Sequence, residues 1–241
     1  MTALISPPAK KRPLVSREVP PLENGDQLTA SEFLRRYDAM PEVKKAELIQ
    51  GTVYMASPVR ADQHGDPDSI IQTWIGTFAA ATGGVRASTN TTTRLGTDEV
   101  PQPDGSLRLL PEYGGQVRVD KKGYLVGAPE FVVEVAASSA SVDSTDKLDT
   151  YRRAGVREYL LWRTVDECVD WLELIEDDYV HILPDEAGII RSHIFPGLWL
   201  DMNALLDLDA SRVLAKLTEG LASTERAAFI AKLKAHATES R

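Results

Sequence analysis

Cysteine is nearly absent from this sequence, which has one, Cys168, among its 241 residues. A single cysteine excludes an internal disulfide bond and any zinc module built from several cysteines. The surrounding segment, Glu167 to Trp171, has the pattern of a strand. We therefore expect Cys168 to be a small buried side chain and not a nucleophile.

Long hydrophobic runs are also missing. No apolar run approaches the ~20 residues that are needed to cross a bilayer, and no apolar segment follows the basic residues near the N-terminus. We expect a soluble, cytoplasmic protein without a membrane partner. Because 43% of the residues are hydrophobic, the chain is able to bury one substantial core.

The sequence has no excess of positive charge, since its formal net charge is -9. This balance argues against a protein that coats nucleic acid, but it does not exclude a nuclease, because metal-binding carboxylates add negative charge. Basic residues gather in two places, at Arg118 to Lys122 and at Arg152, Arg153 and Arg157. Each cluster is equally consistent with charged side chains that are simply solvated at the surface.

The order of the predicted elements indicates the fold class. Residues 1–26 are rich in proline and predict a flexible arm. Residues 27–205 predict a core with a strand, a helix and a strand, followed by a meander. This order is typical of an α/β protein with a mixed central β-sheet and helices on its faces. Residues 206–241 predict two amphipathic helices that pack either on this core or on a second copy, as in a homodimer.

Helix and turn signals divide the core further. Thr29 and Glu32 form a capping box that opens a short helix, and Gln50-Gly51 marks the turn of a hairpin. Asp66 and Pro67 predict the N-cap and first residue of a helix with an apolar stripe. Further N-cap candidates, in Ser138 to Ser141, precede a helix that ends near Ala154.

One strand stands out because it carries a charge. The segment from Phe131 to Ala137 is apolar on both faces, which predicts a strand covered on both sides, yet Glu134 lies in its middle. An unpaired carboxylate there costs several kcal/mol or stays protonated. Glu134 therefore requires a cation, a metal ion or water beside it.

Asp104, Glu134 and Val135 suggest a magnesium site, in which manganese would be a substitute. Asp104, Glu134 and the backbone carbonyl of Val135 would bind the ion if their strands are neighbours, because Mg²⁺ prefers a few carboxylates and waters. Glu47, in the first hairpin, would extend the site, and Lys147 would orient the attacking water or offset charge on the transition state.

The helix after the Glu134 strand supports this hypothesis. Asp143, Lys147 and Tyr151 recur every four residues and therefore share one face. Each feature also has an ordinary interpretation: Asp143 and Lys147 as a surface ion pair, and Asp104 before Gly105 as a turn. His64 lies just before a predicted helix, where a histidine is usually a capping or surface residue. Proximity to Glu47 would favour a role for His64 as a ligand.

In combination, these pieces resemble the PD-(D/E)XK nucleases, and among them the Uma-type restriction endonucleases. The resemblance covers roughly residues 28–205 and rests on five segments with their spacing. They are Glu47-Leu-Ile-x-Gly-x-Val with Met55-Ala-Ser-Pro58, Pro103-Asp104, Ala128-Pro-Glu-Phe-Val-Val-Glu-Val135, the helix with Asp143, Lys147 and Tyr151, and Ala154-Gly-Val-Arg-Glu-Tyr159.

The resemblance implies a restriction endonuclease-like core and magnesium-dependent cleavage of DNA. It implies Asp104 and Glu134 as metal ligands and Glu47 as an accessory acid. The superfamily's lysine two residues after the strand acid is replaced by Ala136, so Lys147 would take its role. The turn Ala136-Ala-Ser-Ser139 also departs from the family's Leu-Ser-Pro-Ser type. Two other functions stay open: an inactive nuclease scaffold that binds nucleic acid or protein, and a structural subunit joined through its C-terminal helices.

Overall fold

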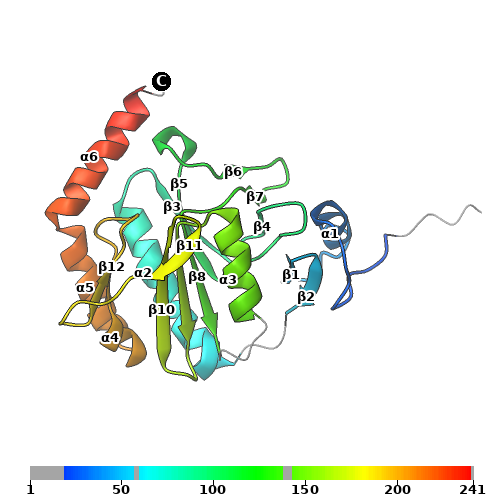
Figure 1. Cartoon of the computed structure of the whole chain (residues 1–241), viewed down its shortest axis with the longest axis horizontal. Helices are drawn as coiled ribbons and strands as arrows, with labels where there is room; N and C mark the ends of the chain where they lie inside the picture. Colours follow the sequence, from blue (N-terminus) through cyan, green and yellow to red (C-terminus); the bar gives the residue numbers. More distant parts are fainter. Residues whose placement is uncertain (1–18, 57–59, 138–142, 240–241) are drawn as a thin grey trace, which may run out of the picture.

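A six-stranded mixed β-sheet forms the centre of the molecule (Figure 1). The computed structural model describes residues 19–56, 60–137 and 143–239, without the side chains of residues 143 and 144. Its helices are α1 (Ala30–Tyr37), η1 (Ala61–Gly65, a π-helix), α2 (Asp66–Ala81), η2 (Pro111–Tyr113, a 3₁₀-helix), α3 (Asp143–Ala154), α4 (Met202–Leu206), α5 (Ala210–Leu221) and α6 (Thr224–Glu239).

The central sheet has the strand order β11-β10-β9-β8-β5-β3. Its strands are β3 (Val85–Thr89), β5 (Gly105–Leu109), β8 (Phe131–Ala136), β9 (Glu158–Arg163), β10 (Cys168–Ile175) and β11 (Asp178–His181). Only β8 and β9 pair in parallel within this sheet, and α3 connects them as a crossover helix. The predicted mixed sheet flanked by helices is confirmed.

Three small sheets surround the central one. They contain β1 (Ala46–Ile49) with β2 (Thr52–Met55), β4 (Thr93–Arg94) with β7 (Leu125–Val126) and β6 (Arg118–Val119), and β12 (Ile189–Arg191) with β13 (Trp199–Asp201). The first is the predicted hairpin, and Gln50 and Gly51 at its turn have φ values of 50° and 76°. An isolated β-bridge between Leu48 and Val100, together with a hydrogen bond from the Gly51 N–H to the Asp98 carbonyl, attaches this hairpin to the segment before β5.

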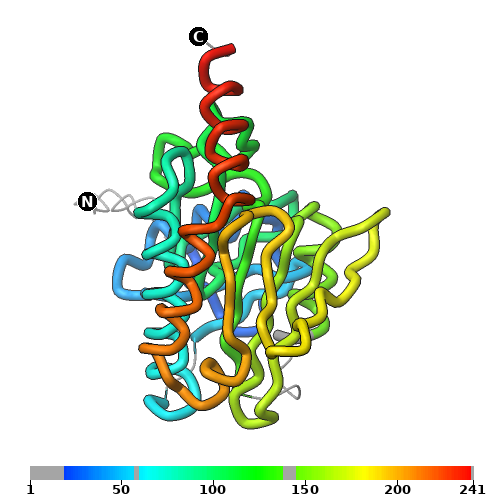
Figure 2. Tube along the Cα trace, turned by 90° about the vertical axis from the view of Figure 1, so that its left-hand side faces the viewer, coloured from blue at the N-terminus to red at the C-terminus, as the bar shows by residue number. Residues whose placement is uncertain are grey.

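Helices cover both faces of the central sheet (Figures 1 and 2). On one face, α2 buries Trp74 and Phe78 against Phe131 and Trp171 in the largest hydrophobic cluster. On the other face, α3 buries Tyr151 in a second cluster. The sheet is therefore covered on both sides around β8, as the apolar pattern of this strand predicts.

Two local predictions need correction. Asp66 is the first residue of α2 and not its N-cap, because η1 runs directly into this helix. Cys168 is half-buried and not fully buried, because it lies at the start of β10, where its Sγ accepts a hydrogen bond from Arg163 at 3.1 Å. The N-cap candidates Ser138 to Ser141 lie outside the described residues.

The C-terminal helices pack on the chain's own core. Val213 and Leu217 of α5 and Leu233 of α6 are buried in the cluster that also contains α2. The end of α6 extends away from the other elements (Figures 1 and 2). The homodimer and the divisions at residues 26 and 205 stay predictions. None of the helices in the described part of the chain combines the length and apolar character required to cross a membrane.

Gly105 allows the first residue of β5 to approach its neighbours closely. A Cβ atom there would lie 2.7 Å from Val133 Cγ1 and 2.8 Å from Ile75 Cδ1. We expect Gly105→Ala to destabilise the protein by about 1–3 kcal/mol through overpacking. Gly76→Ala is the matched control, because its Cβ would meet no atom within 4 Å and alanine favours the interior of α2. Urea unfolding of both variants measures the difference, and equal stabilities would contradict the expectation.

Candidate active site

Asp104 and Glu134 come together because β5 and β8 are antiparallel neighbours. Gly105 lies opposite Val133, so the register places Asp104 opposite Glu134. Both acids are buried, with exposed fractions of 2% and 6%. The condition that the metal hypothesis places on these strands, that they are neighbours, is met.

The backbone of Val135 also faces Asp104. The Val135 N–H donates a hydrogen bond to Asp104 Oδ2 at 2.9 Å. Since the N–H and C=O of one strand residue point to the same side, the Val135 carbonyl is directed toward the β5 side as well. The predicted carbonyl ligand is therefore compatible with the strand geometry.

Lys147 and Tyr151 reach Glu134 from α3, the helix that follows β8. Lys147 Nζ lies 3.2 Å from Glu134 Oε1, and the Tyr151 hydroxyl donates to the same oxygen at 2.6 Å. The four-residue spacing places both side chains on one face of α3, which points at the sheet. Asp143 starts this helix, but its side chain lies outside the described part of the structure.

Glu47 is brought to the same place by the β1–β2 hairpin. Its Oε2 lies 3.0 Å from Lys147 Nζ, and its Oε1 accepts a hydrogen bond from the Gln102 N–H at 2.7 Å. Lys147, whose side chain is 4% exposed, therefore connects two buried glutamates. Lys147 is therefore buried and not a surface residue, and its pair with Asp143 lies outside the described residues.

His64 contacts Asp104 and not Glu47. Its Nε2 lies 3.2 Å from Asp104 Oδ2, and η1 carries it there. The predicted alternative of a capping or surface residue is incomplete, because the histidine side chain is only 27% exposed and is paired with the candidate acid.

Lys45 and Gln72 belong to the site and are absent from the sequence prediction. Lys45 Nζ lies 2.9 Å from Asp104 Oδ1, while Gln72 Nε2 donates to the Asp104 carbonyl oxygen at 2.8 Å. One signal for Lys45 exists in the sequence, since it stands two residues before Glu47 and strand alternation directs both to one face. Gln72 carries no comparable signal.

The two candidate ligands have opposite pKa shifts. Burial acts to raise the pKa of Asp104, but the hydrogen bond from His64 and the charge of Lys45 outweigh it and hold this pKa well below its usual range. Burial raises the pKa of Glu134, and the nearby charges of Asp104 and Glu47 raise it further against the effect of Lys147. A cation beside such a buried carboxylate stabilises its charged form.

The carboxylates of the site suit a hard divalent ion that the protein coordinates only in part, with water or phosphate oxygens as the remaining ligands. Among the described residues, no three His, Cys, Asp or Glu side chains gather as a group that would hold a metal ion by themselves. A structural zinc site would need about four such ligands, whereas Mg²⁺ binds through one or two carboxylates and keeps water or phosphate oxygens. Asp104 and Glu134 fit that second pattern. Both oxygens of Asp104 and both oxygens of Glu47 have protein partners, so an ion would replace some of these contacts.

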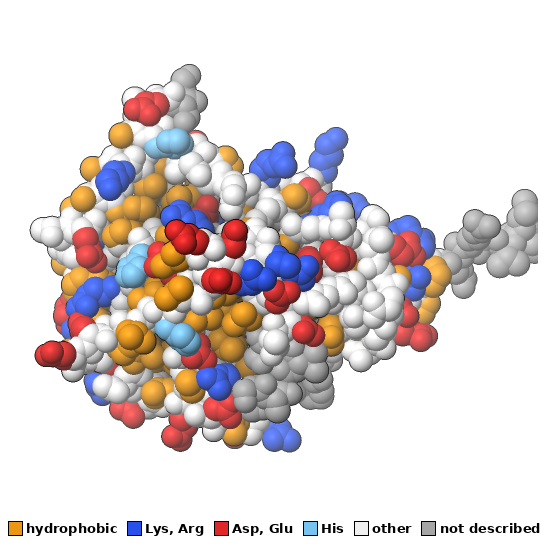
Figure 3. Space-filling view, in the orientation of Figure 1, with side chains coloured by type: hydrophobic (Ala, Val, Ile, Leu, Met, Phe, Trp, Pro, Cys, Tyr) orange, Lys and Arg blue, Asp and Glu red, His pale blue; other side chains and the backbone are white. Residues whose placement is uncertain are grey.

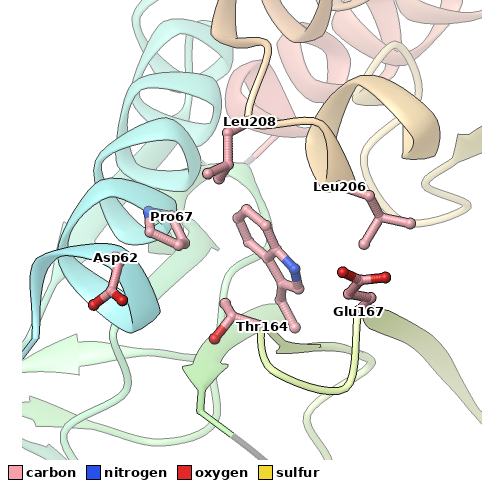
Figure 4. Close-up of a pocket in the computed structure, with 7 residues that line it drawn as sticks. Asp62, Pro67, Thr164, Glu167, Leu206 and Leu208 are labelled. Carbon is pink, nitrogen blue, oxygen red and sulfur yellow. The ribbon is translucent and has the colours of Figure 1, made fainter.

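A pocket of about 200 Å³ lies elsewhere, beside the first turns of η1 and α2 (Figure 4). None of the candidate site residues lines it. Its lining residues are Asp62, Pro67, Trp162, Thr164, Glu167, Leu206 and Leu208.

Half of the basic residues in the two clusters form ion pairs among the described residues. Lys122 pairs with Asp38, and Arg152 and Arg153 pair with Asp149. On the face shown in Figure 3, blue Lys and Arg side chains are mixed with red Asp and Glu side chains and form no continuous patch. Neither cluster is by itself a broad basic surface.

Comparisons with known proteins identify the family of this chain and a solved structure of similar fold. Residues 30–203 match the family Uma2, described as "Putative restriction endonuclease". A search of curated proteins finds no match. A crystal structure of a putative nuclease belonging to DUF820 from Anabaena variabilis ATCC 29413 is similar in fold, with a TM-score of 0.57 and 17% sequence identity. The match covers 75% of this chain and 98% of that one. This chain therefore belongs to the Uma2 family of restriction endonuclease-like proteins.

Proposed function

We propose that this protein is a metal-dependent endonuclease that hydrolyses DNA phosphodiester bonds at the site formed by Asp104, Glu134 and Lys147. One observation carries the proposal: the buried acids Asp104 and Glu134 lie opposite each other on neighbouring strands, and the buried Lys147 of the crossover helix contacts Glu134. Membership of a nuclease family supports the same reaction class.

Each residue has a distinct task in this proposal. Asp104, Glu134 and the Val135 carbonyl would hold Mg²⁺, or Mn²⁺ in its place, and the bound ion would polarise the phosphate and acidify a water molecule. Lys147 offsets the negative charge that develops on the phosphoryl group. Glu47 fixes the position of Lys147 at 3.0 Å, and Tyr151 orients the carboxylate of Glu134 by its hydrogen bond.

His64 and Gln72 keep Asp104 in place. His64 contacts the Oδ2 atom, and Gln72 donates to the backbone carbonyl of the same residue. A carboxylate that is held at both its side chain and its main chain is preorganised, so little free energy is lost in ordering it when the substrate binds.

Positive charge for the substrate backbone is available on β3 and β5. Arg86 and Arg108 are directly opposite each other in this antiparallel pair, and neither has a salt bridge to an acid among the described residues. Like charges directly opposite one another destabilise a sheet. An anion between them, such as a phosphodiester, would offset this repulsion, which supports a nucleic acid as the partner.

The proposal predicts cleavage that depends on a divalent ion. Purified protein with Mg²⁺ or Mn²⁺ should nick and linearise supercoiled plasmid DNA, and EDTA should abolish this activity because two carboxylates and an ammonium do not activate water at neutral pH without the ion. Gel analysis of plasmid and of an RNA of matched sequence measures the activity and the preference for DNA. Retention of nucleic-acid binding without cleavage in either ion would favour an inactive binding module.

A further inference from the structure

The two lysines of the candidate site have different surroundings. Lys147 is 4% exposed and lies between Glu47 and Glu134, whereas Lys45 is 28% exposed and contacts Asp104 and Asn90. A lysine enclosed between two glutamates is held in place. Lys45 lies at the outer side of the site, on a flexible four-carbon stem.

The two oxygens of Asp104 also differ. Oδ2 accepts the Val135 N–H at 2.9 Å and faces His64 Nε2 at 3.2 Å. Oδ1 faces Lys45 Nζ at 2.9 Å. Because the partners of Oδ2 include a backbone group of the central sheet, Oδ1 is the oxygen that is most easily offered to another cation.

Charge balance gives Lys45 a reason to leave this oxygen. The buried carboxylates of Glu47, Asp104 and Glu134 face the ammonium groups of Lys45 and Lys147. A divalent ion at Asp104 would add two positive charges to this group, and Lys45 would then repel the ion at short range. The released ammonium would be free to meet the negative charge of a phosphodiester.

We propose that Lys45 competes with the divalent ion for Asp104 Oδ1 and, once displaced, binds the phosphate of the substrate. This inference rests on the proposed function, because it needs a metal ion at Asp104 and a phosphodiester beside it. It assigns the two lysines different roles: Lys147 is the fixed cation of the site, and Lys45 is the exchangeable one.

The test uses Lys45→Met, which keeps the length of the stem and removes the charge. Calorimetric titration of the full chain with Mn²⁺ should show affinity at least about tenfold tighter than in wild type, because the competing cation is gone. At saturating Mn²⁺, plasmid cleavage should be at least about tenfold slower, because a phosphate contact is lost. Lys44→Met is the control, since Lys44 is exposed and, among the described residues, its ammonium group donates only to the Pro41 carbonyl.

The outcomes separate this inference from the proposed function. Mn²⁺ affinity of Lys45→Met that is equal to or weaker than wild type overturns the inference, and so does an unchanged cleavage rate. Absence of Mn²⁺ binding and cleavage in the wild type overturns the proposed function itself. If Lys45→Met does not fold, Lys45→Gln, which keeps a neutral hydrogen-bond donor, provides the same measurements.

Discussion

Asp104→Asn should lower the rate of metal-dependent DNA cleavage by at least about 10³-fold, because the amide removes the negative charge that would bind the ion while it keeps the shape of the side chain. The substituted side chain still has an oxygen to accept the Val135 N–H, which Asp104 accepts at 2.9 Å. We therefore expect a folded protein without activity. Plasmid cleavage under saturating Mg²⁺ measures the rate, and circular dichroism verifies the fold.

Glu112→Gln is the matched control for this substitution. It removes one negative charge from an exposed residue of η2, outside the candidate site. If general charge governed DNA binding, both variants would change activity similarly. Wild-type cleavage by the Asp104→Asn variant would remove Asp104 from the site and leave the proposed chemistry without its first ligand.

The sequence was sufficient to indicate that Glu134, Lys147 and Tyr151 lie close together. The acid within an apolar strand identifies Glu134, because burial of an unpaired carboxylate is costly. The crossover from β8 to β9 then requires a connecting helix, and the four-residue spacing in that helix points Lys147 and Tyr151 to one face. Connectivity alone thus limits where these side chains lie.

Apart from Lys45, whose two-residue spacing from Glu47 is a signal, the surroundings of Asp104 could not be predicted from the sequence. Lys45, His64 and Gln72 come from three separate elements, and their meeting depends on how the hairpin, η1 and α2 pack on the end of β5. Short polar segments carry no periodicity that fixes such packing. For the same reason, the basic clusters were visible in the sequence while their partners Asp38 and Asp149 were not assigned.

The position of the lysine connects the chemistry of the site with its stability. In the superfamily pattern the lysine lies on the same strand as the acid, but here Ala136 occupies that position and Lys147 approaches from α3. The ion pairs with Glu47 and Glu134 therefore join the hairpin, the central sheet and the crossover helix. Loss of this lysine should affect folding as well as cleavage.

Lys147→Met should destabilise the protein by about 3–5 kcal/mol, because it leaves two buried glutamates without their cation. We also expect cleavage to be lost, since no other ammonium is as deeply enclosed beside Glu134 among the described residues. Urea unfolding monitored by fluorescence measures the free energy of unfolding. Lys122→Met is the control, because Lys122 is exposed and a solvent-exposed ion pair, such as its pair with Asp38, contributes little to stability.

A double variant distinguishes the ion pair from simple packing. Glu47→Gln combined with Lys147→Met removes one buried charge together with its partner, so its loss of stability should be smaller than the sum of the two single losses. Additive losses would show that Glu47 and Lys147 do not interact energetically at their 3.0 Å separation. The hairpin would then have no electrostatic connection to Lys147, and Glu47 would lose its proposed role as the acid that positions this lysine.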